Sequence, residues 1–267
     1  MTELGTELAD LALDAGRAAA DLVRLRAEQD VSVADTKTSD TDVVTAADRA
    51  AESLIRDRIR SVRPDDAFVG EEEAAEPGTT GVRWIIDPID GTVNFLYGLP
   101  QFAVSIAAEV DGEVVAGVVI DVAKRVEYVG RPGPDGTIAL RNDRPIAVRG
   151  PAPLAQRLIA TGFSYQAEVR AVQAAAVGRL LPQIRDIRRF GSCALDLCAV
   201  AEGMLDGFVE EGVHLWDYAA AGLIARTAGA DLQVLTGASG MTLLVCGPRH
   251  GWDEFLAAVK QAGFTRE

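Results

Sequence analysis

The sequence is poor in the residues that build disulfide frameworks and zinc sites. It holds only three cysteines, Cys193, Cys198 and Cys246, and two histidines, His214 and His250. The cysteines form no C-x-x-C pair and the histidines lie far apart, which excludes a disulfide scaffold and argues against a His-rich zinc site. We therefore expect reduced thiols buried in the core of a cytoplasmic protein.

Long apolar runs and positive charge are also scarce. No stretch of about 18 apolar residues is present, and acids between Glu3 and Asp14 interrupt the N-terminal segment, so the sequence predicts neither a membrane span nor a signal peptide. With 26 Lys and Arg against 40 Asp and Glu, the formal net charge is −14. Such an acidic chain argues against nucleic acid or an anionic membrane as a partner. At first sight it also argues against an anionic substrate.

The chain is long enough to bury a sizeable core. Its 267 residues are 48% hydrophobic and 25% charged, which are ordinary values for a globular protein. We expect one catalytic unit over 1–267 that consists of two closely packed halves, 1–150 and 151–267. The sequence has neither an internal repeat nor a low-complexity linker, in agreement with one continuous fold.

Hydrophobic periodicity and turn residues divide the chain into helices and strands. The predicted helices cover residues 3–28, 45–62, 168–181, 193–203, 217–229 and 252–262. The predicted strands cover residues 67–69, 84–86, 103–110, 114–122, 126–130, 137–140, 158–163, 186–190, 206–210, 231–235 and 242–246. The polar stretch 28–42 has the chemistry of a loop. This order predicts an α+β fold, a layered α/β/α/β/α sandwich with two mixed or antiparallel sheets.

The string WIIDPIDGTVNF in the first half of the chain carries the most chemistry. Its apolar strand ends at Asp87, and Asp90 follows beyond a rigid proline. Two carboxylates and the intervening carbonyl of Ile89 are oxygen ligands of the kind that Mg²⁺ prefers. Gly91 and Thr92 then open a short helical turn whose free amides suit a phosphate. The same string is equally typical of an ordinary turn, because Asp-Pro and Asp-Gly pairs are common there.

Three further acids can join this site, and each also has a simpler interpretation. Glu71 opens an acidic run after Gly70, and such runs are usually solvated. Asp217 follows Trp216 at the place where a helix should begin, as an N-cap residue does. Asp48 lies in the second predicted helix, where an acid complements the helix dipole.

Four blocks of the sequence together resemble the inositol monophosphatase family of Mg²⁺-dependent, lithium-sensitive phosphatases. They are the segment from Lys37 to Asp48, then Gly70-Glu71-Glu72, then WIIDPIDGTVNF, and finally WDYAAAG from Trp216 to Gly222. A fifth block, GSCALDLC from Gly191 to Cys198, resembles the start of a family helix. The resemblance covers essentially the whole chain. The DPIDGT block together with a distant WDxAA is highly specific.

The resemblance implies a metal-dependent site. The implied metal ligands, with Asp87 bridging, are Glu71, Asp87, the carbonyl of Ile89, Asp90 and Asp217. Together they would hold about two to three Mg²⁺ ions per active site. With these cations bound, the local charge reverses, so an anionic phosphate becomes a natural ligand in spite of the net charge.

The resemblance also implies how the rest of the site is divided. The phosphate would bind at Gly91 and Thr92. The nucleophilic water would be oriented by the catalytic residues Glu71, Thr92 and Asp48, with the Thr92 hydroxyl hydrogen-bonded to Asp48. The implied substrate side consists of Asp90, Gly191, Ser192, Cys193, Glu210 and Asp217. Lys37 would lie in a mobile loop near the site.

The function that this resemblance favours is hydrolysis of inositol-1-phosphate to inositol and phosphate by a metal-activated water, with lithium as an inhibitor. Members of the superfamily share the metal ligands, so histidinol phosphate, fructose-1,6-bisphosphate and a nucleotide 3′-phosphate are alternative substrates. A regulatory protein that uses the fold as an interaction surface is a different class, which the complete set of ligands disfavours. The implied partner is a small phosphorylated polyol or amino alcohol, and the resemblance implies a homodimer.

Overall fold

The computed structural model describes residues 2–28, 33–36, 43–134 and 136–266. Its α-helices are α1 (Thr2–Ala27), α2 (Ala46–Val62), α3 (Thr92–Leu96), α4 (Ala167–Leu180), α5 (Cys193–Ala201), α6 (Leu215–Thr227) and α7 (Trp252–Gln261). Short 3₁₀ helices cover Leu154–Gln156, Leu181–Gln183 and Arg249–Gly251. Within the described ranges, none of the helices combines the length and the apolar character needed to cross a membrane.

The strands follow the predicted order closely. They are β1 (Val33–Thr36), β2 (Val43–Thr45), β3 (Ala67–Gly70), β4 (Val82–Asp90), β5 (Ala103–Val110), β6 (Glu113–Asp121), β7 (Val126–Gly133), β8 (Gly136–Arg141), β9 (Arg144–Pro145), β10 (Leu158–Thr161), β11 (Asp186–Arg188), β12 (Gly207–Glu211), β13 (Ala230–Thr236) and β14 (Thr242–Pro248). The predicted hairpin between β5 and β6 is confirmed, and its turn residues Asp111 and Gly112 have φ values of 52° and 86°.

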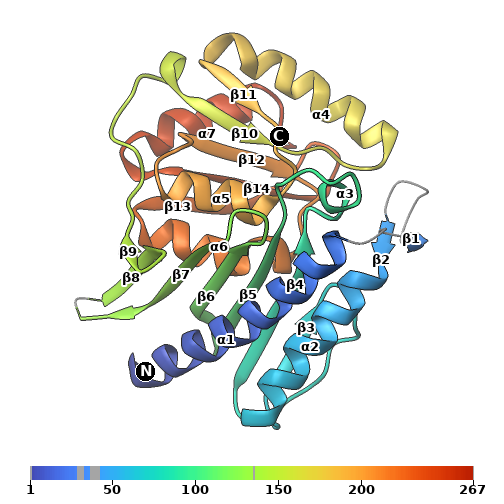
Figure 1. Ribbon diagram of the computed structural model, residues 1–267. Coiled ribbons are helices and arrows are strands. Elements are labelled where there is room, and N and C mark those ends of the chain that lie inside the picture. The colour runs from blue at the N-terminus through green and yellow to red at the C-terminus, as the bar shows by residue number, and fades with distance from the viewer. Residues whose placement is uncertain (1, 29–32, 37–42, 135, 267) are drawn as a thin grey trace.

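Two large sheets form the frame of the molecule (Figure 1). The seven-stranded sheet has the order β3-β4-β5-β6-β7-β8-β9, in which only the β3–β4 pair is parallel. The five-stranded sheet has the order β11-β10-β12-β14-β13, with β11, β10 and β12 parallel and β14 antiparallel to both of its neighbours. Both sheets are therefore mixed, as predicted.

The helices cover the sheets in layers, because successive strand residues face opposite sides. Val104 and Ile106 of β5 pack with the buried residues of α1 and α2, whereas Ala103 and Ala107 pack with α5 and α6. Helices α4 and α7 pack on the outer face of the five-stranded sheet. Figure 1 shows the resulting order of layers, with α5 and α6 between the two sheets. The predicted α/β/α/β/α sandwich is confirmed.

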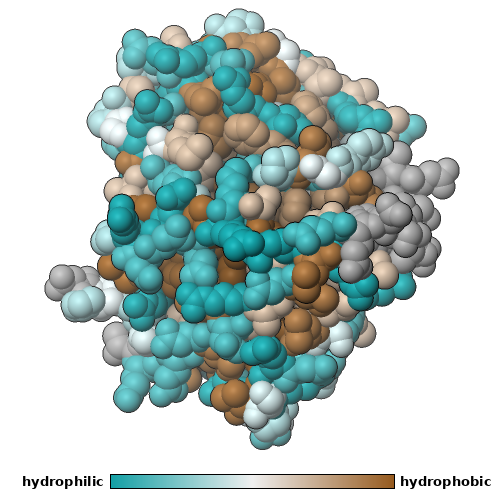
Figure 2. All heavy atoms as spheres, viewed as in Figure 1, coloured by the Kyte–Doolittle hydropathy of each residue, from teal (hydrophilic) through white to brown (hydrophobic). Residues whose placement is uncertain are grey.

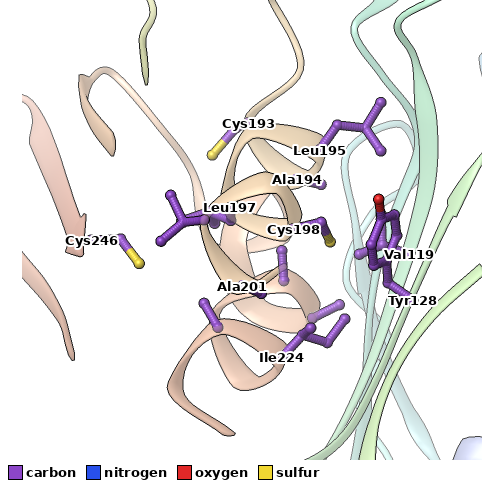
Figure 3. Packing of buried hydrophobic residues seen from close by; sticks show 14 of the residues in the cluster. Val119, Tyr128, Cys193, Ala194, Leu195, Leu197, Cys198, Ala201, Ile224 and Cys246 are labelled. Carbon is purple, nitrogen blue, oxygen red and sulfur yellow. The ribbon is translucent and has the colours of Figure 1, made fainter. Parts of the chain in front are cut away.

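Helix α5 packs in the middle layer with small and medium side chains toward both sheets (Figure 3). Leu197 points toward Cys246 of β14, and Cys198 points toward Val119 and Tyr128 of the seven-stranded sheet. The three cysteines are free and buried, as predicted from their number and spacing.

One predicted loop is wrong over part of its length. The stretch 28–42 contains β1, which pairs antiparallel with β2. β-Branched residues at Val33, Thr36 and Val43 favour a strand there, although the surrounding composition is polar. The predicted loop residue Lys37 lies outside the described residues.

Not all of the acidic excess lies on the surface. Hydrophilic side chains cover most of the face seen in Figure 2, with hydrophobic residues visible between them. The buried acids are Asp48, Glu52, Asp66, Asp87, Asp90, Asp121, Asp196, Asp206 and Glu211. A buried carboxylate is costly unless it is paired or hydrogen-bonded, so each of these acids needs a partner or a function.

Candidate active site

A pocket of about 380 Å³ opens where the two sheets and the middle helix layer meet. It is lined by the end of β4, the end of β12 and the first residues of α5 and α6. Among the described residues, six acids from distant parts of the chain line it: Glu71, Asp87, Asp90, Glu210, Glu211 and Asp217. The fold therefore gathers the predicted metal ligands into one cavity.

Strand β4 carries two of these acids past its predicted end. The strand runs to Asp90 instead of ending at Asp87, and its pairing with β5 shifts between these two residues. Pro88 has no N–H to donate to the ladder, and the irregular register accommodates it. Gly91 then turns the chain at a φ of 97°, and a Cβ there would lie 2.9 Å from the carbonyl oxygen of Gln101. Only glycine fits this turn.

Asp87 is buried among like charges. It is 1% exposed, and its Oδ1 has no hydrogen-bond partner. Burial raises the pKa of Asp87 well above its usual range, and the charges of Glu71, Asp90 and Asp217 raise it further. A bound cation would supply the partner that this oxygen lacks.

Asp90 faces the start of α5. Its nearest partner there, Ser192, follows it by 102 residues in the sequence. Its Oδ2 accepts the Ser192 hydroxyl at 2.5 Å and the Ala194 N–H at 2.7 Å, and its Oδ1 accepts the Cys193 N–H at 3.2 Å. Burial raises the pKa of Asp90 to about 6, although these donors lower it. Ser192 is buried behind Asp90, whereas Gly191 and Cys193 line the pocket.

Asp217 lies in the first turn of α6. This helix begins at Leu215, two residues before its predicted start, and its N-cap is His214. The predicted N-cap position of Asp217 is therefore wrong, but its Oδ2 does accept the His214 N–H at 2.6 Å. Burial raises the pKa of Asp217 well above its usual range, and the charge of Asp90 raises it further.

Thr92 and Asp48 meet on the β4 side of the pocket, as the resemblance implies. The Thr92 hydroxyl lies 3.0 Å from the carbonyl oxygen of Ile89 and 3.4 Å from Asp48 Oδ1, both as acceptors. Asp48 is buried in the first turn of α2, where its charge also complements the helix dipole. Thr92, Gly91 and Ile89 line the pocket itself.

Glu210 lies on the opposite wall, on β12. Burial raises the pKa of Glu210 to about 7, while the positive charge of Arg189 lowers it and Asp90 raises it. A Cβ at Gly162 would lie 2.0 Å from the Glu210 carboxyl group, so the glycine leaves the space that this side chain fills.

Sequence analysis missed several residues of this wall. Phe163, Tyr165, Arg189, His214 and Met241 also line the pocket. The adjacent arginines at 188 and 189, which only Phe190 separates from the GSCALDLC block, were a visible signal in an acidic chain. The others carry no local signature, because nothing near them in sequence marks them as facing a cavity.

Buried Gln173 of α4 connects two parts of the wall. Its Oε1 accepts the Ser164 N–H at 2.8 Å, and its Nε2 donates to the carbonyl oxygen of Glu211 at 2.9 Å. Parallel stacking of His214 on Trp216, with ring centroids 5.0 Å apart, forms another part of the rim. This wall of the pocket is thus built from segments that α4 and α6 hold in place.

The donor set fits a hard divalent cation. The pocket offers carboxylates and a backbone carbonyl, and Asp87 brings a buried oxygen without a partner. Among the described residues, no three Asp, Glu, His or Cys side chains are already grouped as ligands of one ion. The contacts explain this, because Asp90 is turned toward the α5 amides and Asp217 toward the His214 N–H.

Comparisons with known proteins agree with this geometry. The family model described as the inositol monophosphatase family matches residues 5–261. The chain is 43% identical over 234 residues to inositol-1-monophosphatase SuhB of Mycobacterium tuberculosis, covering 84% of this chain and 80% of that relative. It is 39% identical over 222 residues to Nus factor SuhB of Pasteurella multocida, covering 82% of each chain.

A solved structure shows the same fold. The extragenic suppressor protein SuhB from Bartonella henselae matches with a TM-score of 0.86 and 31% sequence identity, covering 96% of this chain and 99% of that one. The family is generally Mg²⁺-dependent, which agrees with the donor set of the pocket. The match across nearly the whole sequence, the shared fold and the acidic pocket lead to one conclusion: this chain belongs to the inositol monophosphatase family of phosphoric monoester hydrolases.

Proposed function

We propose that this protein hydrolyses inositol-1-phosphate to inositol and phosphate with a Mg²⁺-activated water. The observation that carries the proposal is the unpartnered, buried Oδ1 of Asp87 at the centre of an acidic pocket. A pocket of like charges with an orphaned oxygen suits a cation, and a cation-loaded pocket suits a phosphate monoester.

In this proposal the acids divide into two overlapping ligand sets. Glu71, Asp87 and the Ile89 carbonyl would hold one ion, and Asp87, Asp90 and Asp217 a second, with a weaker third near Glu71. When bound, Mg²⁺ would neutralise phosphate charge and lower the pKa of a bound water. The Asp90 carboxylate accepts three hydrogen bonds at the start of α5 and keeps a lone pair for a metal ion. Asp217 accepts the His214 N–H through Oδ2, which leaves its other oxygen for a metal ion. Both can therefore serve as ligands.

The remaining residues would position the substrate and a proton. The Thr92 hydroxyl would donate to Asp48 instead of to the nearer carbonyl oxygen of Ile89, which would leave its lone pairs to accept from the attacking water. Glu71 would orient that water from the other side. Gly91 and Thr92 would hold the phosphate. Glu210, with a pKa raised to about 7, can accept from or donate to a hydroxyl of the polyol.

A phosphate-release assay on a substrate panel tests the proposal. The panel consists of inositol-1-phosphate, histidinol phosphate, fructose-1,6-bisphosphate and 3′-phosphoadenosine 5′-phosphate, each with Mg²⁺ and with EDTA, and lithium is added to the active reactions. We expect Mg²⁺-dependent, lithium-sensitive release that is fastest from inositol-1-phosphate. Faster release from another ester would replace the substrate, and no release from any ester would favour a regulatory role for the fold.

We also propose a homodimer, on the strength of the family resemblance. Light scattering coupled to size-exclusion chromatography measures the mass directly. A monomer at micromolar concentration would contradict this expectation without affecting the proposed chemistry.

A further inference from the structure

Helix α2 carries a buried ion pair outside the pocket. The side chains of Glu52 and Arg56 are both 0% exposed, and Arg56 Nε and Nη2 donate to Glu52 Oε1 at 2.9 Å and 2.7 Å. Burying two charges costs much of what their attraction returns, so such a pair is weak support for stability alone. Its other contacts indicate a second role.

Glu52 holds the backbone that directly follows Glu71. Its Oε2 accepts the Glu72 N–H at 2.8 Å, and its Oε1 accepts the Glu73 N–H at 3.2 Å. Strand β3 ends at Gly70, and residues 71–75 belong to no helix or strand. Glu71 therefore lies just beyond the end of a strand, and the two bonds to Glu52 fix the peptide groups that directly follow it.

Gly70 leaves the space for this contact. A Cβ at Gly70 would lie 2.0 Å from Glu52 Oε1 and 2.5 Å from its Cδ, far inside van der Waals contact. The φ of Gly70 is not in the left-handed region, so the glycine is needed for space and not for its backbone conformation. The glycine before Glu71 in the sequence is thus explained by a carboxylate on another element.

Arg56 extends the same contact to the rest of the segment. Its Nη2 lies 3.3 Å from the carbonyl oxygen of Glu73, and its Nη1 donates to the carbonyl oxygen of Ala74 at 3.3 Å and to Glu76 Oε1 at 3.1 Å. The Glu52–Arg56 pair therefore binds both the N–H and the C=O groups between residues 72 and 76.

We propose that Glu52 is a positioning residue for Glu71, with Arg56 as its counter-charge. This inference rests on the proposed function, in which Glu71 holds a metal ion and orients the water. Glu71 lines the pocket together with Asp87, and like charges repel each other before a cation binds. Moving Glu71 outward would break two hydrogen bonds to a buried carboxylate, so the pair keeps Glu71 in place for the ion.

A Mn²⁺ titration of the whole protein without substrate tests the inference, with free Mn²⁺ measured by electron paramagnetic resonance. Glu52→Gln keeps the size of the side chain but places an amide N–H₂ where one backbone N–H now donates. We expect the dissociation constant of the tightest Mn²⁺ site to rise by about tenfold or more, the usual effect of losing a partner that orients a ligand. In turnover assays, kcat should fall more than KM rises.

Two further variants separate positioning from folding. The double variant Glu52→Gln/Arg56→Met removes the buried charge that the single variant leaves unpaired, so we expect its Tm to recover while Mn²⁺ affinity stays weak. Asp66→Asn is the matched control. Asp66 is also buried, but its carboxylate accepts from Arg63, Thr80 and Trp84, which lie outside residues 71–76. We expect this control to lose Tm and to keep wild-type Mn²⁺ affinity.

The Mn²⁺ affinities of these variants distinguish a failure of the positioning role from a failure of the proposed function. Wild-type Mn²⁺ affinity in both Glu52 variants would overturn the positioning role while leaving the proposed function intact. An equal loss of affinity in Asp66→Asn would overturn it too, because the effect would then follow stability. A wild-type protein that binds no Mn²⁺ at all would overturn the proposed function, and this inference with it.

Discussion

The two ends of strand β4 each adjoin a buried aspartate, and the surroundings of the two aspartates differ. Near the start of the strand, Asp66 accepts from Trp84 Nε1 at 2.9 Å, from the Thr80 hydroxyl at 2.5 Å and from Arg63 Nη2 at 3.1 Å. At the far end, Asp87 is equally buried, yet its Oδ1 has no partner and its neighbours are acids. Burial alone therefore does not distinguish these two acids, whereas the donors and charges that surround each carboxylate do.

The largest expected effect is that of a substitution at Asp87, at the pocket end of β4. Asp87→Asn removes a ligand shared by both proposed ions, so we expect kcat to fall by on the order of 100-fold or more with Mg²⁺. The metal-free protein should instead gain stability, because a charge that is repelled by its neighbours is gone. Phosphate release and urea unfolding in EDTA measure the two effects. Near-wild-type turnover would remove Asp87 from the proposed ligands.

The second prediction concerns the pH dependence of the metal-free protein. The pKa of Asp90 is raised to about 6 in the folded state, so its contribution to stability is fully present below the unfolded pKa and is lost as pH rises through 6. We expect the ionisation of Asp90 to lower the free energy of unfolding by roughly 3 kcal/mol between about pH 4 and pH 7.

Urea unfolding in EDTA at several pH values measures this loss. Asp90→Asn should flatten the slope in that window, and saturating Mg²⁺ should raise the stability most at pH 7, where the carboxylates are ionised. The stability of the metal-free protein could instead rise between pH 4 and pH 7 and show no difference in Asp90→Asn. That result would contradict the expectation that charge repulsion at this end of β4 destabilises the metal-free protein.

The third prediction concerns Asp66, near the start of β4. Asp66→Asn leaves Arg63 without its carboxylate and weakens four hydrogen bonds, so we expect a loss of about 2 kcal/mol in the free energy of unfolding. Turnover per folded molecule at 25 °C should stay within about twofold of wild type, because Asp66 is not among the pocket-lining residues. A loss of kcat as large as that of Asp87→Asn would erase the contrast between the two ends.

The smallest expected effect is that of a substitution at Glu210, whose surroundings are intermediate between those of Asp66 and Asp87. Glu210 is a pocket acid like Asp87, but it is only partly buried and has the positive charge of Arg189 nearby. We expect Glu210→Gln to raise KM for inositol-1-phosphate by about fivefold with little change in kcat, the result of losing binding that ground state and transition state share. The pH dependence of KM with a midpoint near 7 should disappear in the variant. Steady-state kinetics between pH 6 and pH 8 decide this point.

Much of the fold could be predicted because its signals are local. The apolar runs 103–110 and 114–122, with Asp111-Gly112 between them, predicted a hairpin that the structure confirms to within one residue. The errors lie where local preference competes with a tertiary demand. β4 continues through Pro88 because the neighbouring strand β5 pairs with both Asp87 and Asp90, and α6 begins early because His214 caps it.

The residues of the candidate site were likewise predicted only in part from the sequence. Spacing and family resemblance identified the acids at 71, 87, 90, 210 and 217, and the structure places them in one pocket, while their individual roles stay predictions. The contact of Glu52 with the backbone after Glu71 has no signature in the residues around it.

The sequence by itself determined which acids this protein has, the order of its helices and strands, and its family. Only the tertiary structure decided what each carboxylate faces: Arg63 and Trp84 for Asp66, the start of α5 for Asp90, and other acids for Asp87. The physical reason is that periodicity and turn chemistry act over a few residues, whereas the energy of a buried charge depends on donors brought to it from distant segments of the chain.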